Sequence, residues 1–320
     1  MTTSGTYVFS VSRDDIIREA MVNIGKLGES DAITPQETQD CARKLNMLVK
    51  QWQAKTDFAP GLKTWTRRRG YLFLSGTTGQ YSVGPTAVGW TNSFVSTMTT
   101  AIASSGATSI VVNRTTGISS TDNIGVQLDS GTIFWTKVAN VNSGTKTITL
   151  LAGLPSQSSA NNTIFDYSTA AQQPQVIETA LLRDNQNNDV PIKLMTVQEY
   201  DFLPSKTNIQ YNSDPSAIYY EFQLGNSNLF TDVAAATDVT KYLVITYLET
   251  IQDFNNPKDT PEYPQDWFLP LTWGLAKQIA PMFSSPWTPE MEGNYTMSLA
   301  IAQKRDPERT VLYFQCGEEV

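Results

Sequence analysis

The sequence predicts an α+β fold in which N- and C-terminal helices form a helical bundle beside a β-rich middle, with a small all-β domain inserted into that middle. Three observations indicate this fold class. Apolar residues recur at helical spacing near both ends of the 320-residue chain, they alternate as in strands between those ends, and Ser, Thr, Gly and Asn dominate residues 84–165. We therefore expect residues 1–85 and 166–320 to form one body, and residues 86–165 to form an inserted β-sandwich or barrel.

Two amphipathic helices are expected at the N-terminus. Ser12 can cap the first helix, whose apolar positions from Ile16 to Leu27 recur every three or four residues. The second helix begins after the cap residue Thr34 and has Pro35 in its first turn. Its apolar stripe consists of Cys41, Leu45, Leu48 and Trp52. A hairpin of two such helices needs a third element to cover its apolar side, and the C-terminal helices are the expected partner.

Short and evenly spaced strands are expected through the middle of the chain. β-branched residues alternate with polar ones there, and turn sequences such as Asp129-Ser-Gly131 separate the runs. The strands expected in the insert are 109–112, 124–128, 132–138 and 147–151. Those expected after it are 176–182, 190–194, 217–224 and 242–248, with a short helix at 196–203.

Two consecutive apolar helices, each beginning at a proline, are expected at 264–283 and 288–305. The first combines the entry Tyr263-Pro-Gln-Asp-Trp267 with the central run Trp273-Gly-Leu-Ala276, and the second is rich in Ala. Together with the N-terminal helix pair, these patterns resemble the head-to-tail adaptor proteins of short-tailed bacteriophages. The resemblance covers about two thirds of the chain and rests on apolar patterns.

The resemblance implies a structural virion protein, not an enzyme. Such a protein forms a ring adaptor between the portal and the tail, seals the packaged DNA and gives a channel for its ejection. The implied partners are further copies of the chain in a ring of twelve, the portal protein, a downstream tail or nozzle protein, and double-stranded DNA that passes through the lumen without being read. The expected location is the head-tail junction of the virion, and the host cytoplasm during assembly, with no membrane partner.

The tail, residues 307–320, is expected to be a docking arm that becomes ordered on assembly. Its run from Arg309 to Gln315 is apolar and β-prone, and no later element follows with which it can pair. An unpaired apolar strand suits strand addition to a neighbouring protein. The resemblance places this arm on the portal. The expected contacts are Arg309, Val311, Leu312, Tyr313 and Phe314. The alternative is that these side chains fold back onto the chain's own sheet.

Composition restricts the chemistry open to the chain. It contains no histidine, which removes Ser-His-Asp triads, Cys-His nucleophiles and imidazole zinc sites. Its two cysteines, Cys41 and Cys316, cannot provide a disulfide framework. No phosphate-binding loop and no dinucleotide fingerprint occurs, so neither a cofactor nor a metal is expected.

Charge and the remaining chemistry leave two alternative functions open. The net charge of −8 argues against a protein that wraps DNA, but an acidic wall would let a duplex slide past. Carboxylate-only catalysis stays possible without histidine. The first alternative is therefore a carbohydrate-active tail enzyme that uses two carboxylates, and the second is a tail-tube or decoration subunit.

Two charged groups are candidate contact sites. Arg67, Arg68 and Arg69 form the dense cationic run of the sequence, which is expected either to contact a subunit or DNA, or simply to be solvated. A Pro-rich loop and the first turn of the helix that follows it concentrate carboxylates that match no EF-hand pattern, so a structural role is favoured over cation binding. These carboxylates are Asp253, Asp259, Glu262 and Asp266.

Large apolar side chains mark the expected centre of the bundle. The residues expected in the bundle core or at a subunit interface are Leu48, Trp52, Trp267, Leu271 and Leu275. Trp267, Trp273 and Trp287 cluster in the last helical pair, and exposed tryptophans would instead suit a sugar-binding platform. Their helical spacing beside leucines favours the core or interface.

Overall fold

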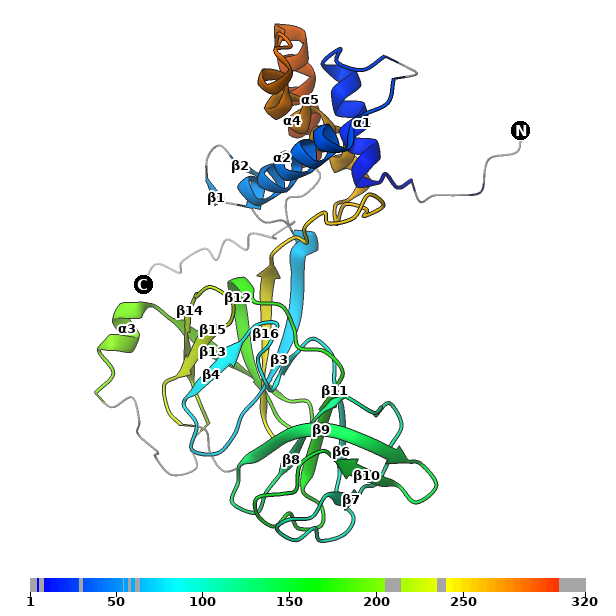
Figure 1. The fold of residues 1–320 in the computed structure, drawn as a ribbon. Helices are drawn as coiled ribbons and strands as arrows, with labels where there is room; N and C mark the ends of the chain where they lie inside the picture. The colour runs from blue at the N-terminus through cyan, green and yellow to red at the C-terminus, as the bar shows by residue number, and fades with distance from the viewer. Residues whose placement is uncertain are drawn as a thin grey trace, which may run out of the picture. The chain divides into compact units, whose positions relative to one another are not determined.

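The computed structural model describes residues 5, 9–28, 31–53, 55–56, 59–60, 64–204, 214–234 and 240–304. The chain divides into two compact units, Met1–Thr66 with Ile251–Val320 and Arg67–Thr250. We call the first the helical unit and the second the β unit, after the elements that each contains (Figure 1).

The helical unit combines elements from both ends of the sequence. Its elements are α1 (Arg13–Asn23), α2 (Pro35–Gln53), the two-stranded hairpin of β1 (Lys55–Thr56) and β2 (Ala59–Pro60), α4 (Phe268–Ile279) and α5 (Pro289–Lys304). Helix α1 begins at a capping box, in which the Asp15 N–H donates to Ser12 Oγ (3.2 Å) and the Ser12 N–H donates to the Asp15 carboxylate (2.9 Å). Helix α4 packs against α1, α2 and α5 and is therefore the central helix of the unit.

An eight-stranded mixed sheet forms one half of the β unit. Its strands run in the order β4-β15-β14-β13-β12-β16-β3-β5. Neighbouring strands of this sheet are antiparallel except for β13 and β14, which are parallel. Helix α3 (Val197–Asp201) lies in the crossover that this parallel pair requires. The strands are β3 (Arg67–Phe73), β4 (Gln80–Val83), β5 (Trp90–Thr91), β12 (Pro174–Arg183), β13 (Asp189–Met195), β14 (Ala217–Glu221), β15 (Ser227–Thr231) and β16 (Tyr242–Glu249).

A six-stranded antiparallel sheet forms the other half. Its strands are β6 (Val95–Met98), β7 (Ser109–Val111), β8 (Asn123–Gln127), β9 (Ile133–Asn142), β10 (Thr147–Leu150) and β11 (Thr163–Tyr167). They pair in the order β6-β11-β8-β9-β10-β7, and a bridge between Thr99 and Val112 joins the two edges. The Thr100 N–H donates to the Val111 carbonyl (2.9 Å) beside this bridge. The sheet is thus closed into a small barrel, which we call the barrel, around a core of aliphatic side chains that includes Ile124 and Ile164.

Aromatic side chains join the barrel to the eight-stranded sheet. Phe73 of β3 stacks on Phe165 of β11 with ring centroids 4.2 Å apart. Both residues belong to one hydrophobic cluster, and Trp135 of β9 packs against that cluster. Two glycines provide space for buried rings within the β unit. An added Cβ at Gly70 would lie 2.0 Å from the Trp90 ring, and one at Gly125 would lie 2.7 Å from the Trp135 ring.

The predicted fold class is wrong. The described chain is β-rich, with sheets of six and eight strands, and it is not a helical bundle formed by the terminal helices. A bundle helix buries a broad apolar stripe, whereas α5 buries only Ser298 and Ala302. The terminal helices are short and enclose one local core. The middle of the chain, which the prediction treated as an addition to a bundle, forms the two large sheets.

The predicted positions of individual strands and of the short helix agree with the structure, although the predicted fold class does not. Strands occur at the expected places in 109–151 and in 176–248, and the short helix occurs as α3. The barrel strands span residues 95–167, but both sheets belong to one compact unit. A separate domain at residues 86–165, with a body made of 1–85 and 166–320, stays a prediction.

Candidate functional site

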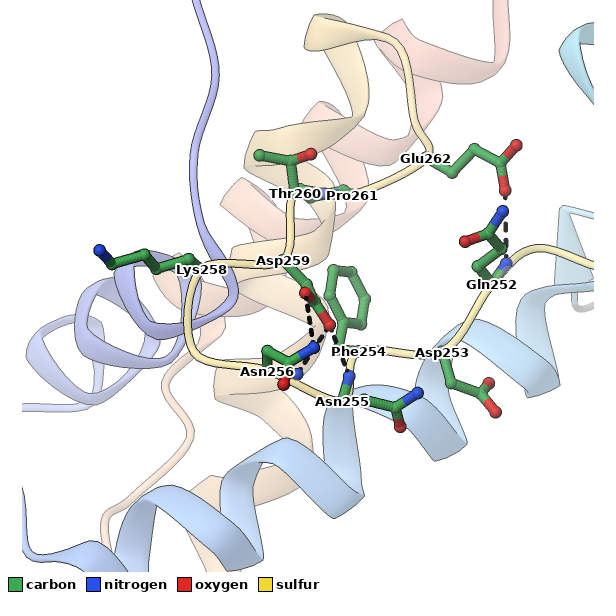
Figure 2. Close-up of a pocket in the computed structure, with 10 residues that line it drawn as sticks. All are labelled: Gln252, Asp253, Phe254, Asn255, Asn256, Lys258, Asp259, Thr260, Pro261 and Glu262. Carbon is green, nitrogen blue, oxygen red and sulfur yellow. Dashed lines mark hydrogen bonds between the residues drawn. The ribbon is translucent and has the colours of Figure 1, made fainter.

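A polar hollow of about 620 Å³ opens in the loop between β16 and α4 (Figure 2). One continuous stretch of chain, Gln252 to Glu262, provides its lining. This loop contains three of the four carboxylates that the sequence singles out. The Lys258 ammonium group is exposed and extends away from these carboxylates in Figure 2.

Hydrogen bonds fix the shape of this loop from within. The Asp259 carboxylate accepts the N–H groups of Asn256 (2.7 Å) and Asn255 (2.8 Å). These two backbone donors stabilise the charged form, and they lower the pKa of Asp259 below its usual value. Asp259 therefore acts as the local cap of a turn.

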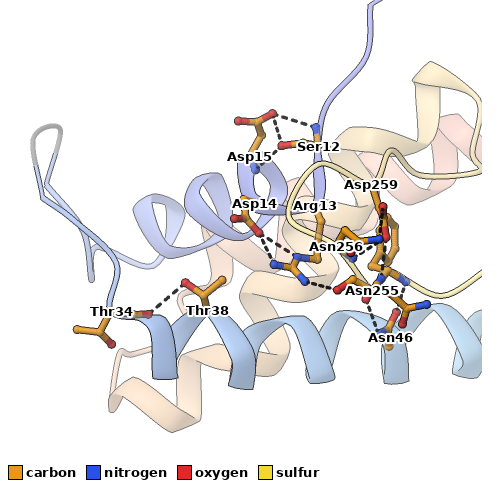
Figure 3. Close-up of polar contacts among 11 residues, drawn as sticks. Ser12, Arg13, Asp14, Asp15, Thr34, Thr38, Asn46, Asn255, Asn256 and Asp259 are labelled. Carbon is orange, nitrogen blue, oxygen red and sulfur yellow. Dashed lines mark hydrogen bonds and ion pairs between the residues drawn. The ribbon is translucent and has the colours of Figure 1, made fainter.

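Helices α1 and α2 hold the loop from outside (Figure 3). The Asn46 side-chain amide donates to the Phe254 carbonyl (3.1 Å), and its oxygen accepts the Phe254 N–H (2.9 Å). Arg13 donates to the Asn255 carbonyl through its guanidinium (3.2 Å) and to the Asp259 carbonyl through its backbone N–H (2.8 Å). These contacts tie residues from the two ends of the chain to one another.

The loop carboxylates have structural partners. Asp253 pairs with Lys50 at 2.7 Å, and Glu262 accepts the Gln252 N–H at 3.4 Å. Within the described residues, His, Cys, Asp and Glu side chains form no group of three or more that is suited to a metal ion. The arrangement matches the favoured structural role of these carboxylates, and the loop serves to brace the helical unit.

The arginine run lies on β3, where two of its members are engaged inside the β unit. Arg67 pairs with Glu178 of β12 at 2.6 Å, and Arg68 pairs with Glu249 of β16 at 2.7 Å. Arg69 has an exposed side chain. Cross-strand ion pairing is a use of this run that the sequence did not suggest, because the partners lie far away along the chain.

The five expected core or interface residues lie together in the helical unit. All of them are buried in one hydrophobic cluster, at 5% exposure or less: Leu48, Trp52, Trp267, Leu271 and Leu275. Trp52 meets Trp267 edge to face with ring centroids 5.8 Å apart. Burial of Trp267 does not suit a sugar platform. Trp273 and Trp287 are partly buried against the same cluster.

The barrel contains a pair of buried carboxyl groups that were not predicted from the sequence. Asp122, at 5% exposure, precedes β8, and Asp166, at 1% exposure, lies on β11. Burial raises the pKa of the Asp166 carboxyl to about 8, and the neighbouring Asp122 carboxyl adds to the rise. The signal was available in the strand Thr163-Ile-Phe-Asp-Tyr167, where an acidic residue stands at an inward position.

The remaining candidates concern the tail and the cysteines. The expected docking arm, residues 307–320 with Arg309, Val311, Leu312, Tyr313 and Phe314, lies outside the described residues, as does Cys316. Cys41 is fully buried on α2, and burial raises the pKa of its thiol to about 11.

No family model matches the sequence, and no curated protein matches it. Among the described helices, none combines the length and the apolar character needed to span a membrane.

Proposed function

We propose that the protein is a structural virion component that forms a ring adaptor between the portal and the tail. The observation that supports this proposal is the outer face of α5. Met297 and Ile301 are one helical turn apart on this face, and they are 68% and 57% exposed. Ser298 and Ala302, which each follow one of these residues and lie about 100° further round the helix, are buried. Helix α5 is therefore apolar on its outward side as well as on the side that faces its own unit.

An apolar outward face gains free energy when a second protein surface covers it. Full burial of a large aliphatic side chain contributes about 1.5–3 kcal/mol. In the proposed ring, the α5 face of one copy packs against the helical unit of the next copy. The buried residues on the inner side of α5 are small and let the helix pack closely on α4. This packing holds the exposed side chains of Met297 and Ile301 in place.

The assignment to the head-tail junction comes from the resemblance of the terminal helices to phage adaptors. In this proposal the docking arm at residues 307–320 reaches the portal, a tail or nozzle protein binds below, and double-stranded DNA passes through the ring. The net charge of −8 supports passage without tight binding, because an acidic lumen repels phosphates. Both the stoichiometry of twelve and the location in the virion are carried over from the family.

Size-exclusion chromatography with light scattering tests the proposal, with the full chain alone and mixed with the portal protein of the same virus. We expect self-association or a portal complex at micromolar concentration for the wild type. The double variant Met297→Glu/Ile301→Glu should stay monomeric with an unchanged circular dichroism spectrum. Thr296→Glu, an exposed polar position on the same helix, is the matched control. A wild type that remains monomeric and fails to bind portal would sink the idea.

A further inference from the structure

A groove on the helical unit lies between α1 and α4, which are side by side in Figure 1. Its volume is about 440 Å³, and most of its lining residues are apolar. Ile16 is buried in its wall, whereas Phe9 and Leu269 are 64% and 57% exposed. An apolar cavity of about 150 Å³ already holds a benzene molecule. The groove therefore has room for more than one large side chain.

Two carboxylates give the groove a negative charge. Asp15 and Glu19 contribute to its lining, are exposed and lie one turn apart on α1. The hydroxyl group and the backbone N–H of Ser12 donate to the Asp15 carboxylate, and these hydrogen bonds lower the pKa of Asp15 below its usual value. None of the described lining residues is a lysine or an arginine. The groove thus suits an apolar partner that carries a cation.

Helix α5 presents a surface of this complementary kind. Met297, Ile301 and Lys304 stand at positions i, i+4 and i+7, so they form one stripe along the helix, which we call the α5 stripe. All three side chains are exposed. Helix α5 contributes no residue to the described lining of the groove. The groove and the α5 stripe are therefore two separate surfaces of the same unit.

We propose that the α5 stripe of one copy docks in the groove between α1 and α4 of a second copy. This inference rests on the proposed ring, and it names the surface that receives the α5 face. In this contact Met297 and Ile301 cover Leu269, and the Lys304 ammonium group pairs with Glu19 at the edge of the groove. Complementary charges at an interface fix its register. Because the two surfaces differ, the contact is head-to-tail, which is the kind of contact that generates rings when the rotation closes.

Two variants that each remove one half of the contact test it by sedimentation velocity of the full chain. Leu269→Asp changes the groove, and Met297→Glu/Ile301→Glu changes the α5 stripe. Each variant alone should self-associate at least about tenfold more weakly than the wild type, as loss of an interface anchor does. Mixed in equal amounts they should form a 1:1 dimer and nothing larger. The intact stripe of the first variant then occupies the intact groove of the second, and no further pair of intact surfaces remains.

A matched control and a charge reversal sharpen this test. Met47 of α2 is 55% exposed and does not line the groove, so Met47→Asp should associate as the wild type does. Lys304→Glu and Glu19→Lys should each weaken self-association by up to about fivefold, and their combination in one chain should restore it. Unchanged circular dichroism spectra establish that the variants keep their helices.

The contact is overturned if Leu269→Asp associates as the wild type does while Met297→Glu/Ile301→Glu stays monomeric. The ring would then use another surface, and the proposed function would stand. A mixture of the two variants that remains monomeric also overturns the contact, and so does a combined charge reversal that associates no better than the single variants. A wild type that stays monomeric up to high micromolar concentration overturns it too, and binding to the portal then decides separately on the proposed function.

Discussion

The helical unit and the barrel differ in how far apart along the sequence their packed residues lie. In the helical unit, Asn46 hydrogen-bonds to Phe254 across 208 residues, and Arg13 reaches Asn255 across 242. The barrel instead takes all of its strands from residues 95–167. Closing a loop costs conformational entropy, and the cost rises with the length of the loop. The barrel builds its core from segments that are near one another in sequence, whereas the helical unit must bring the two terminal segments together.

This difference indicates which contacts of the molecule are most sensitive to substitution. The helical unit and the barrel each have a hydrophobic cluster, but that of the helical unit is shared between the two terminal segments. A change in one terminal segment should therefore disturb helices from the other. A change in the β unit should leave that sharing intact. Four variants, taken from the largest expected effect to the smallest, test the contrast.

Leu275→Asp should have the largest effect. Leu275 is fully buried at the centre of α4, the helix that contacts α1, α2 and α5. An unpaired carboxylate there should cost more than about 4 kcal/mol. We expect loss of the helical signal at 222 nm and an insoluble product. The control is Leu269→Asp on the same helix, where the side chain is 57% exposed; normal folding of both variants would contradict the shared core.

Gly70→Ala should destabilise the β unit by about 1–3 kcal/mol, as overpacking does. The added methyl group would lie 2.0 Å from the ring of Trp90, which is fully buried. Urea unfolding followed by tryptophan fluorescence measures the loss. Gly144→Ala is the matched control, because the nearest atom to its Cβ is 3.5 Å away. Equal midpoints for the two variants would show that the ring moves aside without cost.

Asn46→Ala should weaken the brace between α2 and the loop by about 1–2 kcal/mol, since a donor and an acceptor of Phe254 lose their partner. Hydrogen exchange at the Phe254 amide should become faster. Gln39→Ala, at an exposed position of the same helix, controls for the higher helix propensity of Ala. Unchanged exchange at Phe254 would indicate that the loop holds its shape through Asp259 alone.

Arg67→Ala should have the smallest effect, about 0.2–1 kcal/mol, because both Arg67 and Glu178 are close to one third exposed. The difference from wild type should shrink in 1 M NaCl, which screens exposed charges. Arg69→Ala is the comparison, since its side chain is exposed on the same strand. A larger loss for Arg69 than for Arg67 would point to a contact of the arginine run beyond the observed ion pair.

Local features of the fold could be predicted from the sequence. The cap at Ser12 and the strands around Asp129-Ser-Gly131 depend on neighbouring residues, and both occur as expected. The balance between helix and sheet could not be judged in this way. Closure of the barrel depends on a bridge between Thr99 and Val112, two unremarkable positions whose pairing follows from the path of the intervening chain.

The candidate sites show the same limit. The run Arg67–Arg69 was evident, but Glu178, 111 residues later, was not recognisable as its partner. The crowded carboxylates near Asp259 were evident too, and their backbone donors indicate a structural use. Asp166 was overlooked because one acid in an apolar strand is a weak signal until the register places Asp122 beside it.

The register of β6 and β11 shows how the barrel could be replaced by another segment. Val95, where the chain enters the barrel, is the direct partner of Asp166, close to where it leaves. Entry and exit are therefore adjacent, so a segment of another length could replace the barrel without displacing the strands that precede and follow it. Such an exchange has one requirement. Phe73 belongs to the flanking sheet and stacks on Phe165 of the barrel, so any successor must supply an apolar face of its own.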